Sequence, residues 1–151
     1  MSKIKRSNTK SKIKSKKENQ VCSSEQYPWF SFRFMTLNKK YNIRFLNSLQ
    51  TNEREKTIYC LYKRMEEISS RPWVYWGRLR KHEGLETIPF EVIHFSINGD
   101  TELSDDAKIY VFRFDTFRGK GCGRILGFKK SPCSTFHVIG YDFDFSSYPH
   151  G

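Results

Sequence analysis

The chain has 151 residues and a formal net charge of +11 at neutral pH, and 37% of its residues are hydrophobic. This length suits one domain with a packed core and leaves no room for a second. No run of residues approaches the roughly 18–20 apolar residues of a membrane span, and no apolar segment follows the first lysines as in a signal peptide. We therefore expect a cytoplasmic protein with no membrane partner.

Positive charge is concentrated at the N-terminus. Residues 1–20 hold eight lysine and arginine residues against one acidic residue, Glu18, so +7 of the net +11 lies there and +4 remains for the rest. Serine, asparagine and threonine separate these basic residues, and a stretch of this composition buries too little apolar surface to fold. We expect a disordered basic arm over residues 1–26 and a single domain over residues 27–151.

The arm is suited to electrostatic binding of a polyanion. RNA, DNA or an acidic lipid surface would attract it, with an affinity that falls steeply as salt rises. A solubilising tail without a dedicated partner is the alternative. The lysines of the arm that we assign to nucleic-acid binding are Lys12, Lys14, Lys16 and Lys17.

The first element of the domain is a predicted strand. Phe30, Phe32 and Phe34 recur at the period of two that is typical of a strand with one buried face. This pattern predicts a strand over residues 29–36. Residues 41–46 fit either a second short strand or the start of a helix.

Two helices are predicted next. Asn52 and Glu55 have the spacing of a capping pair, in which each side chain satisfies a free backbone amide at the start of a helix. The following apolar residues fall on one stripe of that helix: Ile58, Leu61, Tyr62, Met65 and Ile68. Pro72 suits the first turn of a second helix over residues 72–80. The inner, packing side of this second helix comprises Trp73, Trp76 and Leu79.

Three strands are predicted in the last third of the chain. They cover residues 108–114, 124–129 and 135–143, which are rich in β-branched and aromatic side chains. Two short segments with turn chemistry, 119–123 and 131–134, separate them, and links this short join antiparallel neighbours. We expect the glycines of the first segment to form a tight hairpin turn.

The order of elements predicts an α+β fold made of a strand, two helices and a three-stranded antiparallel meander. The helices would cover one face of a single sheet and leave the other face for solvent or a ligand. Residues 81–106 are polar and irregular, with a short strand within residues 88–97.

This layout over residues 29–148, together with the basic balance, resembles the RelE/ParE superfamily of small toxins. The resemblance is one of topology and includes no diagnostic motif. It implies either cleavage of messenger RNA, as in the RelE branch, or action on gyrase, as in the ParE branch. It also implies an antitoxin, a partner protein that covers the open face of the sheet.

RNA cleavage without a metal ion needs a base for the 2′-hydroxyl, a cation for the phosphate and an acid for the leaving oxygen. We assign the catalytic roles to Arg113, Arg124, His137 and Tyr141, and we expect them to emerge together on the open face. Alternation along the last strand places His137 and Tyr141 on one face. Additional phosphate contacts are assigned to Lys129 and Lys130, and further proton-transfer candidates are Tyr148 and His150.

Structural alternatives exist for these residues. Arg113 and Arg124 lie in apolar strands, where an unpaired charge is costly, so each must reach solvent or find a carboxylate. The nearest carboxylates in the sequence are Asp115, Asp142 and Asp144. His137 would then be a packing residue. Two other hypotheses are a non-catalytic nucleic-acid-binding module and a protein-interaction domain.

We expect neither a cofactor nor a metal ion. A zinc site would require residues whose spacing lacks the close pairs of known zinc motifs, namely Cys122, Cys133, His137 and His150. Asp142 and Asp144 share one face of the last strand, which is compatible with a divalent cation but is also common by chance.

Overall fold

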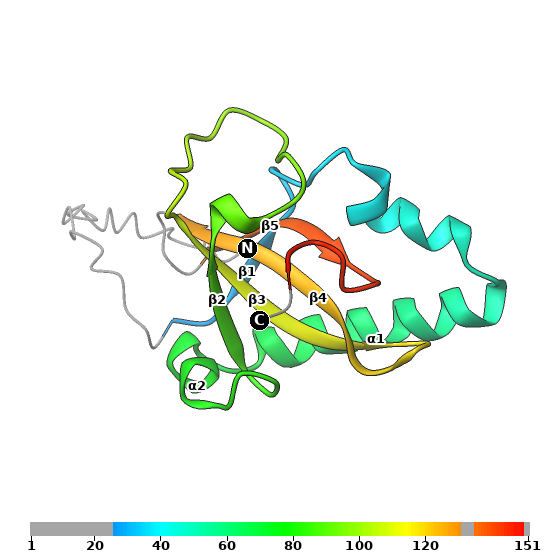
Figure 1. Cartoon of the computed structure of the whole chain (residues 1–151). Helices are drawn as coiled ribbons and strands as arrows, with labels where there is room; N and C mark the ends of the chain where they lie inside the picture. Colours follow the sequence, from blue (N-terminus) through cyan, green and yellow to red (C-terminus); the bar gives the residue numbers. More distant parts are fainter. Residues whose placement is uncertain (1–25, 131–134, 150–151) are drawn as a thin grey trace, which may run out of the picture.

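The computed structural model describes residues 26–130 and 135–149, and they form an α+β fold around one five-stranded sheet (Figure 1). The strands are β1 (Trp29–Ser31), β2 (Leu85–Pro89), β3 (Lys108–Thr116), β4 (Gly119–Lys130) and β5 (Thr135–Asp142). The helices are α1 (Thr51–Ser69) and α2 (Trp73–Arg78), with short 3-10 turns at Lys39–Tyr41, Ile43–Ser48 and Phe90–Val92. The expected fold class is therefore confirmed. No helix in the described ranges has the length and apolar character needed to cross a membrane.

The sheet has the strand order β1-β5-β4-β3-β2. β3, β4 and β5 form the expected antiparallel meander, β2 extends it on one edge, and β1 pairs in parallel with β5 on the other. The first strand is shorter than the predicted 29–36, and the strand expected within 88–97 lies earlier, at β2. The ambiguous residues 41–46 belong to the 3-10 turns. The arm lysines Lys12, Lys14, Lys16 and Lys17 lie outside the described residues.

Helix α1 begins slightly before the predicted cap. Gln50 and Glu53 form a capping box in place of Asn52 and Glu55, and the Gln50 amide donates to the Glu53 carboxylate at 3.2 Å. Thr57 occupies the inner side of the helix, where its hydroxyl accepts a hydrogen bond from the Phe117 amide. The predicted stripe is consequently only partly buried: Leu61 and Ile68 are buried, Met65 is half-buried, and Ile58 and Tyr62 are exposed.

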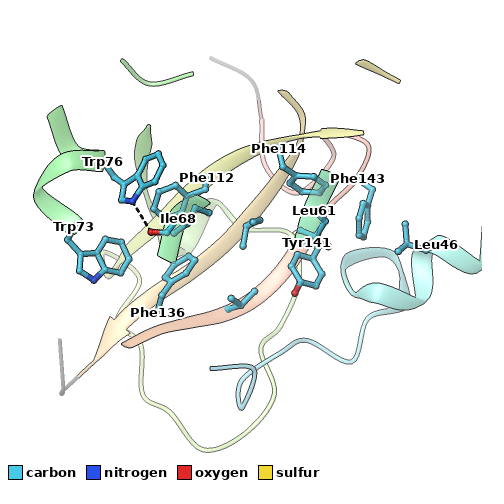
Figure 2. Packing of buried hydrophobic residues seen from close by; sticks show 12 residues of the cluster. Leu46, Leu61, Ile68, Trp73, Trp76, Phe112, Phe114, Phe136, Tyr141 and Phe143 are labelled. Carbon is cyan, nitrogen blue, oxygen red and sulfur yellow. Dashed lines mark hydrogen bonds between the residues drawn. The ribbon is translucent and has the colours of Figure 1, made fainter. Parts of the chain in front are cut away.

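The helices cover one face of the sheet, as expected, and build the larger of two apolar clusters (Figure 2). Trp73 and Trp76 of α2 pack against Phe112, and the Trp76 indole donates to the Ile68 carbonyl at 3.0 Å. Both tryptophans are buried, so their assignment to packing is confirmed.

The opposite face is not open, and this expectation was wrong. A second cluster lies there, in which Phe34, Phe95 and Tyr148 cover the central strands. Those strands are apolar on both faces, with Val111 and Leu126 fully buried on this side, so both faces require a cover. Loops that approach from distant parts of the chain provide it (Figure 1).

The hairpin between β3 and β4 turns on Phe117 and Arg118, not on the glycines as expected. The glycines lie inside β4. A Cβ atom at Gly123 would overlap the Phe114 ring, and Gly121 has a positive φ of 64°. These glycines allow β4 to approach β3 closely near the point where the pairing register of the two strands shifts.

Candidate anion-binding site

The residues expected to form one catalytic surface lie in three separate places. Arg113 of β3 and Arg124 of β4 are directly opposed cross-strand neighbours. His137 is opposed to Phe128, four positions along β4 from Arg124, which corresponds to roughly 13 Å. Tyr141 faces the helices. The expectation that all four emerge together is therefore wrong.

Tyr141 is on the helix side because alternation breaks within β5. Val138 and Gly140 oppose consecutive residues of β4, so one extra residue, Ile139, bulges between them. As a result Val138 and Tyr141 both join the helix-side cluster, and Tyr141 packs near Leu61 (Figure 2). Burial raises the pKa of Tyr141 to about 12.

His137 and the two lysines beside it contact aromatic rings. The imidazole stacks on Phe128 with a centroid distance of 5.1 Å and meets the Phe34 ring edge-on. Burial, followed by the charges of Lys130 and Arg33, lowers its pKa. Lys129 lies over the Trp73 and Tyr110 rings, and burial lowers its pKa. Lys130 is exposed, 6.0 Å from the Phe34 ring.

Arg124 forms an ion pair with a carboxylate, which was the structural alternative to a catalytic role. Its side chain is 1% exposed, and its Nη1 lies 3.3 Å from Oδ2 of the fully buried Asp142. The guanidinium carbon lies 4.0 Å from the ring centre of Phe145 and 3.9 Å from that of Tyr148. Burial lowers the pKa of Arg124, although the adjacent Tyr148 and Asp142 act in the opposite direction.

The carboxylate of Asp142 has its hydrogen-bonding capacity filled. It accepts bonds from the backbone amides of Asp144, Ser146 and Ser147 and from the Ser147 hydroxyl. Burial pushes the pKa of Asp142 up, but the bonds from Ser147 and Ser146 and the Arg124 charge outweigh it, so the pKa lies below its ordinary value. This pair holds the C-terminal segment against the sheet.

Arg113 belongs to a second, less saturated pair. The Glu86 side chain of β2 is 8% exposed, and its Oε1 lies 2.9 Å from Lys81 Nζ. Its Oε2 lies 3.8 Å from Arg113 Nη2, which is an ion pair but not a hydrogen bond. The Arg113 guanidinium carbon also lies 5.4 Å from the Phe145 ring centre.

These groups line a cavity of about 420 Å³, which we call the anion pocket. Its polar lining comprises Lys81, Glu86, Arg113, Arg124 and Tyr148, together with Thr87. Among the described residues, the buried atoms of this lining that have no hydrogen-bond partner include Glu86 Oε2, Arg113 Nε and the Tyr148 hydroxyl. Since buried polar atoms are almost always hydrogen-bonded, such a group of orphans indicates a place for a polar ligand.

The pocket offers both cations and proton-transfer groups. Lys81 and Arg113 supply positive charge, and a guanidinium fork matches the oxygens of a phosphate. Burial raises the pKa of Tyr148 to about 12, so its phenol stays protonated at neutral pH and can donate a hydrogen bond. Glu86 supplies an oxygen that can accept a proton.

Sequence reasoning missed Glu86 and Lys81, and it included Tyr148 only as a secondary candidate. One signal was available for Glu86, since it interrupts an otherwise strand-like segment, Leu85–Pro89, with a carboxylate. A charge within a strand needs a partner, and the partner here comes from the next strand along the chain.

Within the described ranges no group of three or more His, Cys, Asp and Glu side chains could hold a metal ion. Two members of the hypothetical zinc set, Cys133 and His150, lie outside those ranges.

Comparisons of the chain with protein-family models, with curated proteins and with solved structures find no match.

Proposed function

We propose that the anion pocket binds a phosphodiester of RNA and cleaves it without a metal ion. The observation that carries the proposal is the buried Glu86 carboxylate, which lies between two cations with one oxygen lacking a hydrogen bond. A base beside a phosphate-binding cation is the minimum that attack by a 2′-hydroxyl requires.

The proposed reaction uses four side chains in three roles. Glu86 Oε2 takes the proton of the 2′-hydroxyl as the 2′ oxygen bonds to phosphorus. Arg113 and Lys81 stabilise the charge that develops on the phosphate oxygens. The bond from phosphorus to the 5′ oxygen breaks, and that oxygen takes the Tyr148 proton, leaving a 2′,3′-cyclic phosphate. Solvent then returns a proton from Glu86 to Tyr148.

Arg124 acts differently from its predicted role. Although Arg124 lines the pocket, its side chain is 1% exposed, contacts two aromatic rings and is paired with Asp142, so we assign it no direct contact with the phosphate. Its charge lies beneath Tyr148, and we assign it to positioning that ring over the pocket.

The test is incubation of the full chain with messenger RNA, with and without ribosomes, in the presence of a chelator. Cutting is expected in the unchanged protein, with a rate that falls roughly 100- to 10,000-fold in Glu86→Gln because the proton acceptor is lost. His137→Ala is the matched control and should cut normally. Intact RNA under every condition would remove the proposal.

A toxin role follows from such cleavage. Expression in a bacterial host should arrest growth. Cells that express Glu86→Gln should grow normally, although this variant accumulates to the same level. Growth arrest that persists in Glu86→Gln would instead favour a non-catalytic mode of toxicity.

A protein-interaction domain is the second candidate, supported by an apolar surface around a cavity of about 460 Å³. Phe32, Leu37 and Ile43 on its rim are all substantially exposed. Sedimentation velocity over a range of concentrations tests whether this surface pairs two copies of the chain. Association that vanishes in a Leu37→Ser, Ile43→Ser double variant would support this candidate, and a monomer at every concentration would oppose pairing of two copies.

A further inference from the structure

A third hollow, of about 630 Å³, which we call the hairpin groove, lies between α1 and the β3–β4 hairpin. β2 pairs with β3 only as far as Phe112, so the edge of β3 beyond that residue faces the helix. Arg113 lines both the hairpin groove and the anion pocket. Arg113 is thus the one residue that the two linings share.

The walls of the hairpin groove are held by Arg64 of α1. Its Nε donates to the Arg113 carbonyl at 2.9 Å, and its Nη2 donates to the Glu83 carbonyl at 2.9 Å. Its guanidinium also packs over the Trp76 ring. One side chain thus ties the helix to β3 and to the turn before β2, which gives a groove that exists before any ligand binds.

The residues that line the hairpin groove carry a small net positive charge. Glu67 is paired with Arg64 at 3.1 Å, and the Asp115 carboxylate accepts a bond from the Gly121 amide at 2.8 Å. Lys63 and Lys120 are exposed, and neither has an ion pair within the described residues. Asp115 keeps its negative charge in that bond, and Glu83 also lines the groove. The four basic residues of the lining, Lys63, Arg64, Arg113 and Lys120, therefore exceed the three acidic ones, Glu67, Glu83 and Asp115, by one charge.

An aromatic side chain lies beside these cations. Tyr59 of α1 lines the groove and is 65% exposed. A phenol ring next to lysines is the combination on which single-stranded nucleic acids bind, since bases stack on the ring and phosphates meet the ammonium groups.

The geometry points to the hairpin groove as the binding site for the nucleotides of single-stranded RNA that flank the phosphate in the anion pocket. This inference rests on the proposed function, in which Arg113 holds the phosphate. The RNA strand would continue from that phosphate into the groove. Lys63 and Lys120 contact phosphates, and Tyr59 stacks a base.

The probe is a fluorescent 2′-O-methyl RNA of about 12 nucleotides, within the site sizes typical of single-strand binders. It has no free 2′-hydroxyl, so binding by fluorescence anisotropy is measured independently of cleavage. In the full chain, Lys63→Ala with Lys120→Ala should weaken binding about tenfold and reduce the log–log salt slope by roughly 1.4, as expected for two lost phosphate contacts.

Two matched controls separate the groove from general attraction. Lys39→Ala with Lys108→Ala removes the same charge from exposed positions elsewhere and should leave the affinity within about twofold. Tyr59→Ala should weaken binding roughly tenfold, whereas Tyr62→Ala, on the same helix and equally exposed, should not. Equal losses in the two lysine pairs, or no loss in either, would overturn the inference.

The binding measurement also distinguishes the two proposals. If the protein binds the probe through the groove but does not cleave ordinary RNA, the proposed function is contradicted and the groove is retained. If the protein cleaves RNA but substitutions at Lys63, Lys120 and Tyr59 leave binding unchanged, only the groove is contradicted.

Discussion

Two arginine–carboxylate pairs lie side by side on one face of the sheet, and they differ in how fully the hydrogen bonds of the two carboxylates are used. Arg124 and Asp142 are sealed, and the carboxylate accepts several bonds besides the arginine. Arg113 and Glu86 are 3.8 Å apart, with an oxygen and a nitrogen that have no hydrogen bond among the described residues. The saturated pair stabilises the fold, and the unsaturated pair is where a ligand would complete the bonding.

The largest effect is expected from breaking the saturated pair. Asp142→Ala leaves the Arg124 charge buried without its carboxylate, which should lower the free energy of unfolding by about 3–5 kcal/mol. Urea denaturation measures it. Asp106→Ala, at an exposed position, is the control and should stay within about 0.5 kcal/mol. A loss below about 1 kcal/mol for Asp142→Ala would show that the pair is not structural.

Alkaline pH should act on the tyrosine that covers the saturated pair. The pKa of Tyr148 is raised from 10.0 to about 12, so the folded state disfavours its ionised form. The contribution of Tyr148 to the free energy of unfolding should therefore be fully present below pH 10 and decline as pH rises from 10 toward 12. Tyrosinate absorbance should show that Tyr148→Phe removes one late-titrating group. Full ionisation of every tyrosine near pH 10 would contradict this account.

Glu86→Gln should change stability far less than Asp142→Ala. The amide fills the same volume, and Glu86 Oε2 gives up no hydrogen bond. The ion pair of Oε1 with Lys81 is lost, but the Lys81 side chain is 56% exposed and Arg113 is partly exposed, so water can solvate both cations. We expect a change of about 1 kcal/mol or less in the free energy of unfolding. A loss as large as that of Asp142→Ala would mean that both pairs are structural, and the contrast between them would disappear.

Tyr148→Phe should have the smallest effect. The hydroxyl has no hydrogen-bond partner among the described residues, so its removal should cost less than about 0.5 kcal/mol or stabilise slightly. Tyr148→Ala, by contrast, removes the ring over Arg124 and should cost about 3–5 kcal/mol. A large loss in Tyr148→Phe would reveal a bond to the hydroxyl and weaken its assignment to the pocket.

Local patterns predicted most of the elements. The aromatic stripe with Trp73 and Trp76 packs as expected, and the dense β-branched and aromatic segments form the meander. Helix and strand periodicity are properties of neighbouring residues, so they can be seen in a single sequence. The cap of α1 was misplaced by two residues because Gln50–Glu53 and Asn52–Glu55 have the same spacing.

The candidate site was harder to predict because it depends on distant contacts and on one bulge. The extra residue at Ile139 reverses the faces of β5, so Tyr141 turned inward while His137 did not. Part of the cover on the second face comes from segments that have no periodic pattern, such as those that carry Phe95 and Tyr148. Glu86 meets Arg113 only because β2 pairs with β3, a contact between segments more than 20 residues apart in the sequence.

Whether Glu86 acts as the base is decided by the chemistry of the RNA ends produced in the presence of a chelator. We expect 2′,3′-cyclic phosphate ends from the unchanged protein and their loss in Glu86→Gln, at equal folded fraction by circular dichroism. Cyclic ends formed at the same rate by Glu86→Gln, or 5′-phosphate ends that appear only with added magnesium, would contradict this role of Glu86.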